Sequence, residues 1–361
     1  MRTLSCQLRS PPASDRRATA NHTVTARSRH GLLRPAAVGA GGLLPELPEP
    51  KDFDAFWAHT LAQNPFDPAS VSIAPVTTPL RTHRVQDVTF GGYAGDPIRA
   101  WLIAPADQSG PLPAVVEFLG MGGGRGLPQD NLAWAAAGYA HLVMDTRGQG
   151  SHWGSGGDTP DPHGTGPAAA GFATHGLQSP EEYLYRRLFV DAHHAVEAAA
   201  VLPEVDASRI AVTGVSQGGG LTLAAAGLNH RVIAAMPDVP FMCALTRAVG
   251  LTDDPPYADI AGYLAVHRDE VEQVRRTLAY FDGALLGARA TCPALFSTGL
   301  MDTTCPPSTV FAARNRWGQA AVPAPARPEI RVYPFNGHEG GESYQWREQV
   351  AWLAALHQNL E

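Results

Sequence analysis

A serine set between glycines is the first group in this sequence that could act as a nucleophile. Residues 214–218 have the pattern G-x-S-x-G and follow the apolar run 210–213. A serine hydroxyl is a weak nucleophile unless a base accepts its proton and amide donors surround it. A sharp strand-to-helix turn exposes the serine beside the first amides of the helix. We therefore predict that Ser216 attacks acyl groups, and that Gly214 and Gly218 allow the close backbone approach of this turn.

A histidine that could accept the serine proton lies near the end of the chain. Four histidines follow the serine in the sequence: His230, His267, His338 and His357. Only His338 lies on a loop directly after the last predicted strand, at 330–333. Folds with this type of serine turn present their catalytic histidine on such a loop. The prediction for the general base is therefore His338.

An aspartate must hold the imidazole in the tautomer that accepts a proton. Asp302 follows the predicted strand at 294–299, and Asp238 follows an earlier predicted strand at 232–236. The position of Asp302 gives the chain order nucleophile, acid, base. We prefer Asp302 for this reason, and Asp238 is the alternative.

Two backbone amides are needed to bind the oxyanion that forms on an acyl carbonyl. One is the amide of Gln217, directly after the serine, and the other is predicted at Met121, in the glycine-rich stretch 119–124 that follows a strand. A phosphate-binding loop is the alternative for this stretch, but no G-K-S/T sequence follows it, and Arg125 stands in place of the lysine.

Two further patterns near these residues have weaker chemical content. Arg147 and Gln149 lie in an R-G-Q-G sequence after a strand. The arginine either braces the nucleophile loop or forms a structural ion pair, and we prefer the structural ion pair. The dipeptide His338-Glu339 resembles the start of a zinc-binding helix, but position 342 holds glutamate instead of histidine. The sequence therefore predicts no metal site there.

The elements that must position these residues follow a β-α-β pattern. Short apolar runs alternate with helical segments, which is typical of a mainly parallel sheet flanked by helices. These runs are 114–118, 140–145, 210–214, 232–236, 294–299 and 330–333. We also predict an N-terminal helical extension opening at 52–57 and a helix from an N-cap at Ser179 to about Val201. Residues 247–290 form a predicted helical insertion near the active site.

The composition changes near residue 42. Residues 1–42 contain seven arginines and one acidic residue, so we expect a disordered leader or a start codon assigned too early. Residues 43–361 form one predicted α/β domain.

The whole chain of 361 residues has a net charge of −7 and no basic stripe in its main body, which disfavours nucleic acid as a partner. The sequence contains no run of 18 apolar residues, so it predicts no membrane-spanning helix. Four widely separated cysteines fit reduced thiols in a cytoplasm.

Three motifs together resemble the signature of carbohydrate esterase family 7. These are the R-G-Q-G sequence at 147–150, the G-x-S-Q-G sequence at 214–218 and the H-E pair at 338–339. The family contains acetyl xylan esterases and cephalosporin C deacetylases of the α/β-hydrolase superfamily. The resemblance extends from about Leu44 to the C-terminus.

The resemblance implies a serine esterase that removes acetyl groups from small esters, such as acetylated xylooligosaccharides or cephalosporin C. It implies the triad Ser216, Asp302 and His338, no metal or organic cofactor, and a cytoplasmic homo-oligomer, commonly a hexamer. One position departs from the family, which usually has tyrosine where this chain has Met121. The alternatives are another acyl hydrolase, such as a longer-chain carboxylesterase or a peptidase, and a non-catalytic scaffold.

Overall fold

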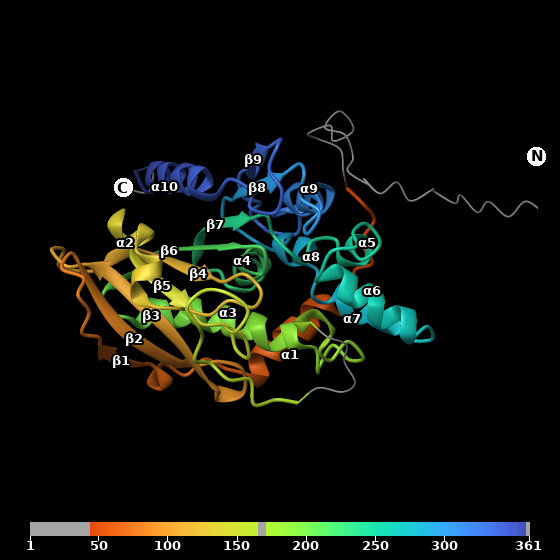
Figure 1. Ribbon diagram of the computed structural model, residues 1–361, viewed down its shortest axis with the longest axis horizontal. Helices are drawn as coiled ribbons and strands as arrows, with labels where there is room; N and C mark the ends of the chain where they lie inside the picture. Colours follow the sequence, from red (N-terminus) through yellow and green to blue (C-terminus); the bar gives the residue numbers. More distant parts are fainter. Residues whose placement is uncertain (1–43, 165–170, 359–361) are drawn as a thin grey trace, which may run out of the picture. The chain divides into compact units, whose positions relative to one another are not determined.

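The computed structural model describes residues 44–164 and 171–358, and within them nine strands form one sheet (Figure 1). The strands are β1 (Ser72–Pro75), β2 (His83–Gly91), β3 (Pro97–Pro105), β4 (Leu112–Phe118), β5 (Ala140–Met144), β6 (Val205–Val215), β7 (Val232–Asp238), β8 (Leu295–Gly299) and β9 (Glu329–Tyr333). Their order is β1-β2-β3-β5-β4-β6-β7-β8-β9. From β5 to β9 all neighbours are parallel, whereas β1, β2 and β3 add an antiparallel extension. The leader predicted at 1–42 lies outside the described residues.

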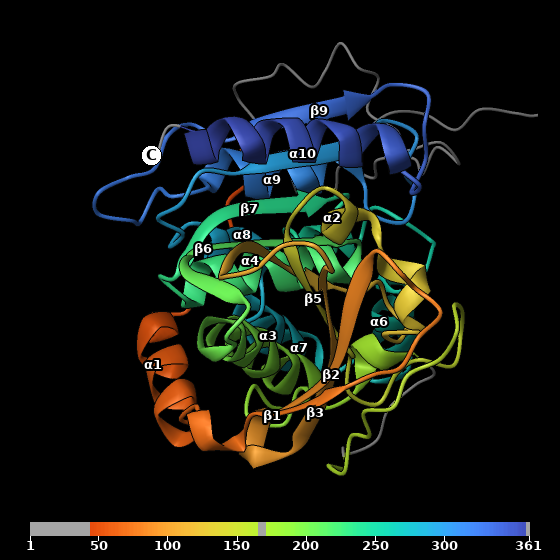
Figure 2. The same ribbon diagram turned by 90° about the vertical axis from the view of Figure 1, so that its left-hand side faces the viewer.

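Helices cover both faces of the sheet. They are α1 (Phe53–Gln63), α2 (Ala133–Ala136), α3 (Leu184–Val201), α4 (Gln217–Leu228), α5 (Leu245–Ala248), α6 (Tyr257–Val266), α7 (Val271–Ala279), α8 (Gly283–Gly287), α9 (Pro307–Arg316) and α10 (Glu342–Gln358). Successive residues of a strand point to opposite faces, so Val116 packs in the cluster that contains α3 and α4, and Val115 packs in the cluster that contains α2 and α10. In Figure 2, α2 and α10 lie in front of the sheet.

The six predicted strands are all present, and so is the N-terminal helix. Phe53 and Trp57 of α1 are buried, Phe56 is half-buried, and the three rings meet Tyr280 and Phe281 from the end of α7. These aromatic contacts fix α1 to the body of the protein.

The predicted start of α3 is wrong. Ser179 does not cap the helix; its hydroxyl accepts a hydrogen bond from the Glu181 amide in a preceding turn. Tyr183, with φ −59° and ψ 131°, separates this turn from the helix. Its ring is fully buried, and its hydroxyl donates to the Ala173 carbonyl at 3.0 Å. Burial of this tyrosine in an extended conformation, and not the capping pattern at 179–182, decides where the helix begins.

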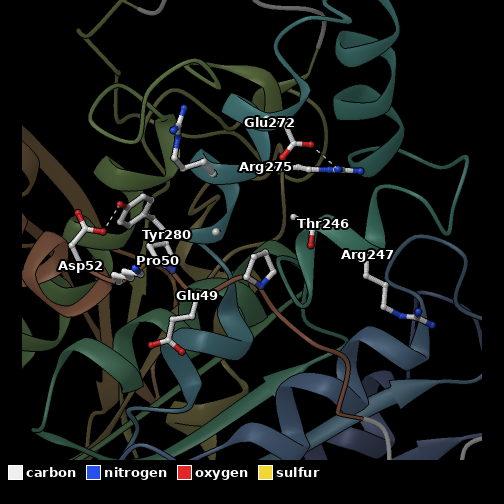
Figure 3. Close-up of a pocket in the computed structure, with 12 residues that line it drawn as sticks. Glu49, Pro50, Asp52, Thr246, Arg247, Glu272, Arg275 and Tyr280 are labelled. Carbon is white, nitrogen blue, oxygen red and sulfur yellow. Dashed lines mark hydrogen bonds and ion pairs between the residues drawn. The ribbon is translucent and has the colours of Figure 1, made fainter.

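The insertion between β7 and β8 contains four helices, α5 to α8, within the described residues. Its segment 252–254 contacts the loop after β8, because the Thr252 hydroxyl donates to the Thr303 carbonyl. Together with residues 48–52, α5 and α7 line a cavity of about 670 Å³ (Figure 3). None of the residues that line it is a predicted catalytic residue. No helix among residues 44–164 and 171–358 is long and apolar enough to span a membrane.

Candidate active site

Ser216 lies at the turn between β6 and α4. It has a positive φ of 59° with ψ −115°, a conformation that residues other than glycine rarely adopt. The turn is held by hydrogen bonds from the Ser216 amide to the Asp238 carbonyl and from the Phe241 amide to the Ser216 carbonyl, at 3.0 and 2.9 Å. This geometry presents the serine hydroxyl at the N-terminus of a buried helix.

The two glycines of the motif are required by close packing. A Cβ atom on Gly218 would lie 2.1 Å from the Phe118 carbonyl oxygen, and one on Gly214 would lie 2.6 Å from the same oxygen. The turn therefore sits directly against the end of β4. Only glycine at both positions allows this approach without moving the backbone.

The structure brings Ser216, His338 and Asp302 together. His338 Nε2 lies 2.9 Å from Ser216 Oγ, and His338 Nδ1 lies 2.9 Å from Asp302 Oδ2. His338 comes from the loop after β9 and Asp302 from the loop after β8, so three strand ends contribute one residue each. The aspartate is fully buried, whereas the imidazole is about 30 % exposed. This hydrogen-bonded chain can move a proton from a serine hydroxyl to an imidazole.

Asp302 is held as a hydrogen-bond acceptor. Its Oδ1 accepts hydrogen bonds from the amides of Thr304 and Cys305, at 2.9 and 2.8 Å. Both amides use this oxygen as a hydrogen-bond acceptor. They also leave Oδ2 free to face the imidazole, so backbone geometry fixes the side chain in the orientation that His338 requires.

Asp238, the alternative acid, is engaged by a different group. Its carboxylate accepts a hydrogen bond from Ser297 in β8. Burial raises the pKa of Asp238 to about 6, and the Ser297 hydroxyl and nearby His338 oppose this rise. Asp238 is thus a buried structural carboxyl beside the site, and the geometry favours Asp302.

One predicted oxyanion donor directly follows the serine, and the other lies on the loop after β4. Gln217 is the first residue of α4, where backbone amides have no acceptor within the helix. Met121 lies on the loop after β4; its carbonyl accepts from the Trp153 indole at 2.7 Å. The next residue, Gly122, has a positive φ of 82°, and a Cβ there would lie 2.8 Å from His152. The loop therefore needs glycine beside Met121 to reach this position.

Gln149 links the R-G-Q-G sequence to the serine turn. Its Oε1 accepts from the Gly122 amide at 2.7 Å, and its side chain pairs with that of Gln217 through two hydrogen bonds of 3.1 Å. The hydroxyl of buried Tyr185 also donates to Gln217 Oε1, at 3.0 Å. Sequence reasoning missed Tyr185, because nothing in the local pattern of α3 distinguishes it from a packing aromatic residue.

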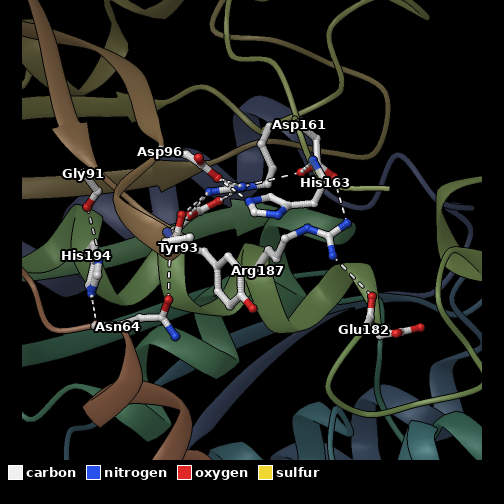
Figure 4. Close-up of polar contacts among 12 residues, drawn as sticks. Asn64, Gly91, Tyr93, Asp96, Asp161, His163, Glu182, Arg187 and His194 are labelled. Atoms are coloured by element: carbon white, nitrogen blue, oxygen red, sulfur yellow. Dashed lines mark hydrogen bonds and ion pairs between the residues drawn. The ribbon is translucent and has the colours of Figure 1, made fainter. Parts of the chain in front are cut away.

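Arg147 occupies a buried ion-pair network, in agreement with the structural role expected for it. Its guanidinium contacts Asp191 at 2.5 and 2.8 Å and Asp96 at 2.8 Å. These carboxylates raise its pKa against the opposing effect of burial. Figure 4 shows the surrounding contacts, in which Asp96 also meets His163 and Asp161 meets Arg187. The network fastens the loop after β5 to α3 and to the turn before β3.

Glu339 orders the loop that carries His338. Its exposed carboxylate accepts from the Asn336 side chain at 3.0 Å, and hydrogen bonds from the backbone of Glu339 itself and from Asn336 lower its pKa. Among the described residues, no group of three or more His, Cys, Asp or Glu side chains is arranged to hold a metal ion, and this includes Glu339.

A mainly parallel sheet, a serine on a sharp strand-to-helix turn and a histidine after the last strand define the α/β-hydrolase class of proteins. The family model for acetyl xylan esterase (AXE1) matches residues 43–356. The structure is similar to that of an acetyl xylan esterase from Paenibacillus sp. R4, with TM-score 0.78 and 37 % identity over 87 % of this chain and 97 % of that one.

A second solved structure and a curated relative are also similar. Acetyl xylan esterase 1 from Thermoanaerobacterium sp. JW/SL YS485 has TM-score 0.76 and 32 % identity, covering 86 % of this chain and 95 % of that one. Acetyl esterase Axe7A from Xylanibacter ruminicola is 28 % identical over 328 residues, which are 86 % of this chain and 68 % of the relative. The chain belongs to the acetyl xylan esterase family, and it is a carboxylic ester hydrolase that acts on acetyl esters.

Proposed function

We propose that this protein removes acetyl groups from small esters through an acyl-enzyme formed on Ser216. The observation that carries the proposal is the hydrogen-bonded chain from Ser216 Oγ to His338 and on to Asp302, with 2.9 Å at each step. The three side chains come from separate strand ends, so only the folded protein assembles them. Their types and contacts are those of a nucleophile, a general base and the acid that orients the base.

The first half of the reaction transfers the acetyl group. Ser216 Oγ forms a bond to the acetyl carbonyl carbon while His338 Nε2 accepts the hydroxyl proton. The amides of Met121 and Gln217 donate to the carbonyl oxygen as it becomes negatively charged. The bond to the leaving alcohol then breaks, and His338 gives that alcohol its proton. The acetyl group remains bound to the serine as an ester.

The second half repeats these steps with water as the nucleophile. His338 accepts a proton from water, the oxygen attacks the acetyl-serine, and acetate leaves as Ser216 regains its proton. No step draws on a metal or an organic cofactor. The base must be neutral, because a protonated imidazole cannot accept the serine proton.

The substrate class we propose is acetylated xylooligosaccharides, with the acetyl ester of cephalosporin C as a further candidate. The names of two similar solved structures, both acetyl xylan esterases, support the sugar esters. The antibiotic ester rests on the resemblance of the three motifs alone. Met121 in place of the usual tyrosine changes a side chain at the oxyanion loop, so the preference among acetyl esters has to be measured.

The test is the initial rate on p-nitrophenyl acetate, butyrate and octanoate for the wild type and for Ser216→Ala. The proposal predicts that acetate is preferred and that the variant loses turnover of all three. A preference for octanoate would contradict the acetyl specificity and leave the nucleophile in place. Full activity of Ser216→Ala would contradict the mechanism itself.

A further inference from the structure

Two glutamine side chains behind the serine form a reciprocal amide pair. Gln149 Nε2 donates to Gln217 Oε1, and Gln217 Nε2 donates to Gln149 Oε1, both at 3.1 Å. Gln217 is fully buried and Gln149 is 7 % exposed. A hydrogen bond away from water holds its partners more firmly than one at the surface, so this pair is a rigid connection between the loops that carry the two residues.

The orientation of each side-chain amide in the pair is fixed by a backbone group that can only donate or only accept a hydrogen bond. The Gly122 amide can only donate, and it donates to Gln149 Oε1 at 2.7 Å. The Leu119 carbonyl can only accept, and it accepts from Gln217 Nε2 at 3.4 Å. With one end of each amide set by the backbone, the remaining oxygen and nitrogen atoms meet in the complementary arrangement.

Tyr185 reinforces this orientation from α3. Its hydroxyl lies 3.0 Å from Gln217 Oε1, and complete burial raises the pKa of this phenol well above its ordinary value. The phenol therefore keeps its proton and donates it to the amide oxygen. A flipped Gln217 would place two N–H groups toward the donors of Tyr185 and Gln149, which would leave buried donors without acceptors.

The contacts of the pair lie on both sides of one predicted oxyanion donor. Leu119 and Gly122, which the two glutamines bind, are the residues that enclose Met121 in the loop after β4. The second predicted donor is the main-chain amide of Gln217 itself. The same pair of side chains thus sets the position of the Met121 loop relative to the first turn of α4.

We infer that Gln149 and the side chain of Gln217, oriented by Tyr185, are positioning residues that hold the two oxyanion-binding amides at a fixed separation. The inference rests on the proposed function, in which the amides of Met121 and Gln217 bind the developing negative charge. Oxyanion donors act mainly in the transition state, and a small displacement of such a group costs much of the rate. Loss of the pair therefore lowers kcat more than it changes KM.

The experiment compares Gln149→Met, Gln217→Met and the double variant on p-nitrophenyl acetate. Methionine keeps the length of glutamine and removes its amide. Each single variant is expected to lower kcat by about 10- to 100-fold with KM within about threefold, since one displaced donor costs about that much. The double variant should lose about as much as the worse single variant, because both substitutions break the same pair.

A transition-state analogue gives a readout that a structural role alone would not change. Trifluoroacetone adds to the serine oxygen and leaves an oxyanion that the two amides must bind. Its affinity for Gln149→Met should fall by the same factor as kcat/KM. Tyr185→Phe, which removes one hydroxyl and no bulk, is expected to lower kcat by about threefold to tenfold, and it tests the same connection if the methionine variants fail to fold.

Asn229→Leu is the matched control. Asn229 is a buried amide that follows the opposite end of α4, where its side chain contacts His193 and Glu197. The Asn229→Leu substitution should lower the melting temperature and leave kcat at the wild-type value. A kcat for Gln149→Met that also stays at the wild-type value, or a rise in KM alone, would overturn the inference. Ser216→Ala is measured in parallel. Activity in this variant would contradict the proposed function, whereas wild-type kcat in Gln149→Met alone would contradict only the inference about the amide pair.

Discussion

The substitution Asp302→Asn is expected to abolish most activity while changing only one atom. Asp302 Oδ1 accepts from the amides of Thr304 and Cys305, at 2.9 and 2.8 Å. In the variant the amide oxygen must stay at these two donors, because the reversed orientation would leave two buried N–H groups unpaired, at about 1 to 3 kcal/mol each. The new NH2 group then faces His338 Nδ1 in place of Oδ2.

This orientation forces the imidazole into the wrong tautomer. Nδ1 must now accept a hydrogen bond, so the ring proton moves to Nε2, which lies 2.9 Å from Ser216 Oγ. A protonated Nε2 cannot accept the serine proton. The comparable change in a serine protease lowers kcat by about 10⁴-fold, which corresponds to about 5.4 kcal/mol of lost transition-state stabilisation. We expect a loss of the same order for this enzyme.

The assay is kcat and kcat/KM on p-nitrophenyl acetate at about pH 8, together with the melting temperature. Asp238→Asn is the matched control, because Asp238 is also a buried carboxyl at a strand end and its hydrogen-bond donor is Ser297 instead of the imidazole. It should keep kcat within about tenfold of the wild type, since its loss leaves the tautomer unchanged. A loss below about tenfold in Asp302→Asn, with its fold intact, would refute the reasoning.

Four further predictions concern stability. Gly218→Ala should destabilise the protein by about 1 to 3 kcal/mol, because its Cβ would lie 2.1 Å from the Phe118 carbonyl oxygen. Gly262→Ala in α6, whose Cβ meets no atom within 4 Å, should instead stabilise it by about 0.5 to 1 kcal/mol in urea unfolding. Since burial raises the Asp238 pKa from 3.8 to about 6, the folded protein binds this proton more tightly. The wild type should therefore lose about 2 kcal/mol of stability as pH rises from 4 to 6, a slope that Asp238→Asn removes. Arg147→Lys should lower the free energy of unfolding by about 2 to 4 kcal/mol and leave the kcat of the folded enzyme within about threefold; a selective loss of kcat would contradict its structural role.

The parallel half of the sheet could be predicted from the sequence, and the antiparallel extension could not. Strands such as β5 are buried on both faces, so their sequences are nearly continuous apolar runs. In β2, charged residues interrupt the pattern: Asp87 forms ion pairs with Arg99 of β3 and with buried Arg125. Its partners come from distant parts of the chain, and no local pattern shows that these charges are paired within the fold.

The start of α3 escapes sequence-based prediction for a related reason. Serine followed by proline and two glutamates has the composition of a helix N-terminus, and Ser179 does accept a hydrogen bond from a backbone amide. A turn and a cap use the same side-chain contact. What separates them is the burial of Tyr183 in an extended conformation, which depends on residues packed from elsewhere in the fold.

In the candidate site, too, one part could be predicted from the sequence and another part could not. The residue types of Ser216, Asp302 and His338 and their order along the chain were enough to predict that these side chains meet, as their contacts of 2.9 Å show. The contacts of Gln149 and Tyr185 do not follow from order, since each reaches Gln217 from another element, across 68 and 32 residues. A motif records which residues occur together, whereas the hydrogen bonds between motifs depend on how the strands align.

The amide pair gives a physical reason for the R-G-Q-G and G-x-S-Q-G sequences to occur together. Gln149 supplies one amide of the pair and Gln217 the other, so each sequence is incomplete without its partner. The pair holds the loop on both sides of Met121 through main-chain groups, the Leu119 carbonyl and the Gly122 amide. Under the proposed function, exchanging the tyrosine usual in the family for methionine changes the side chain at position 121 and leaves the main-chain amide in place. In this arrangement substrate preference can vary at position 121 independently of the stabilisation of the oxyanion.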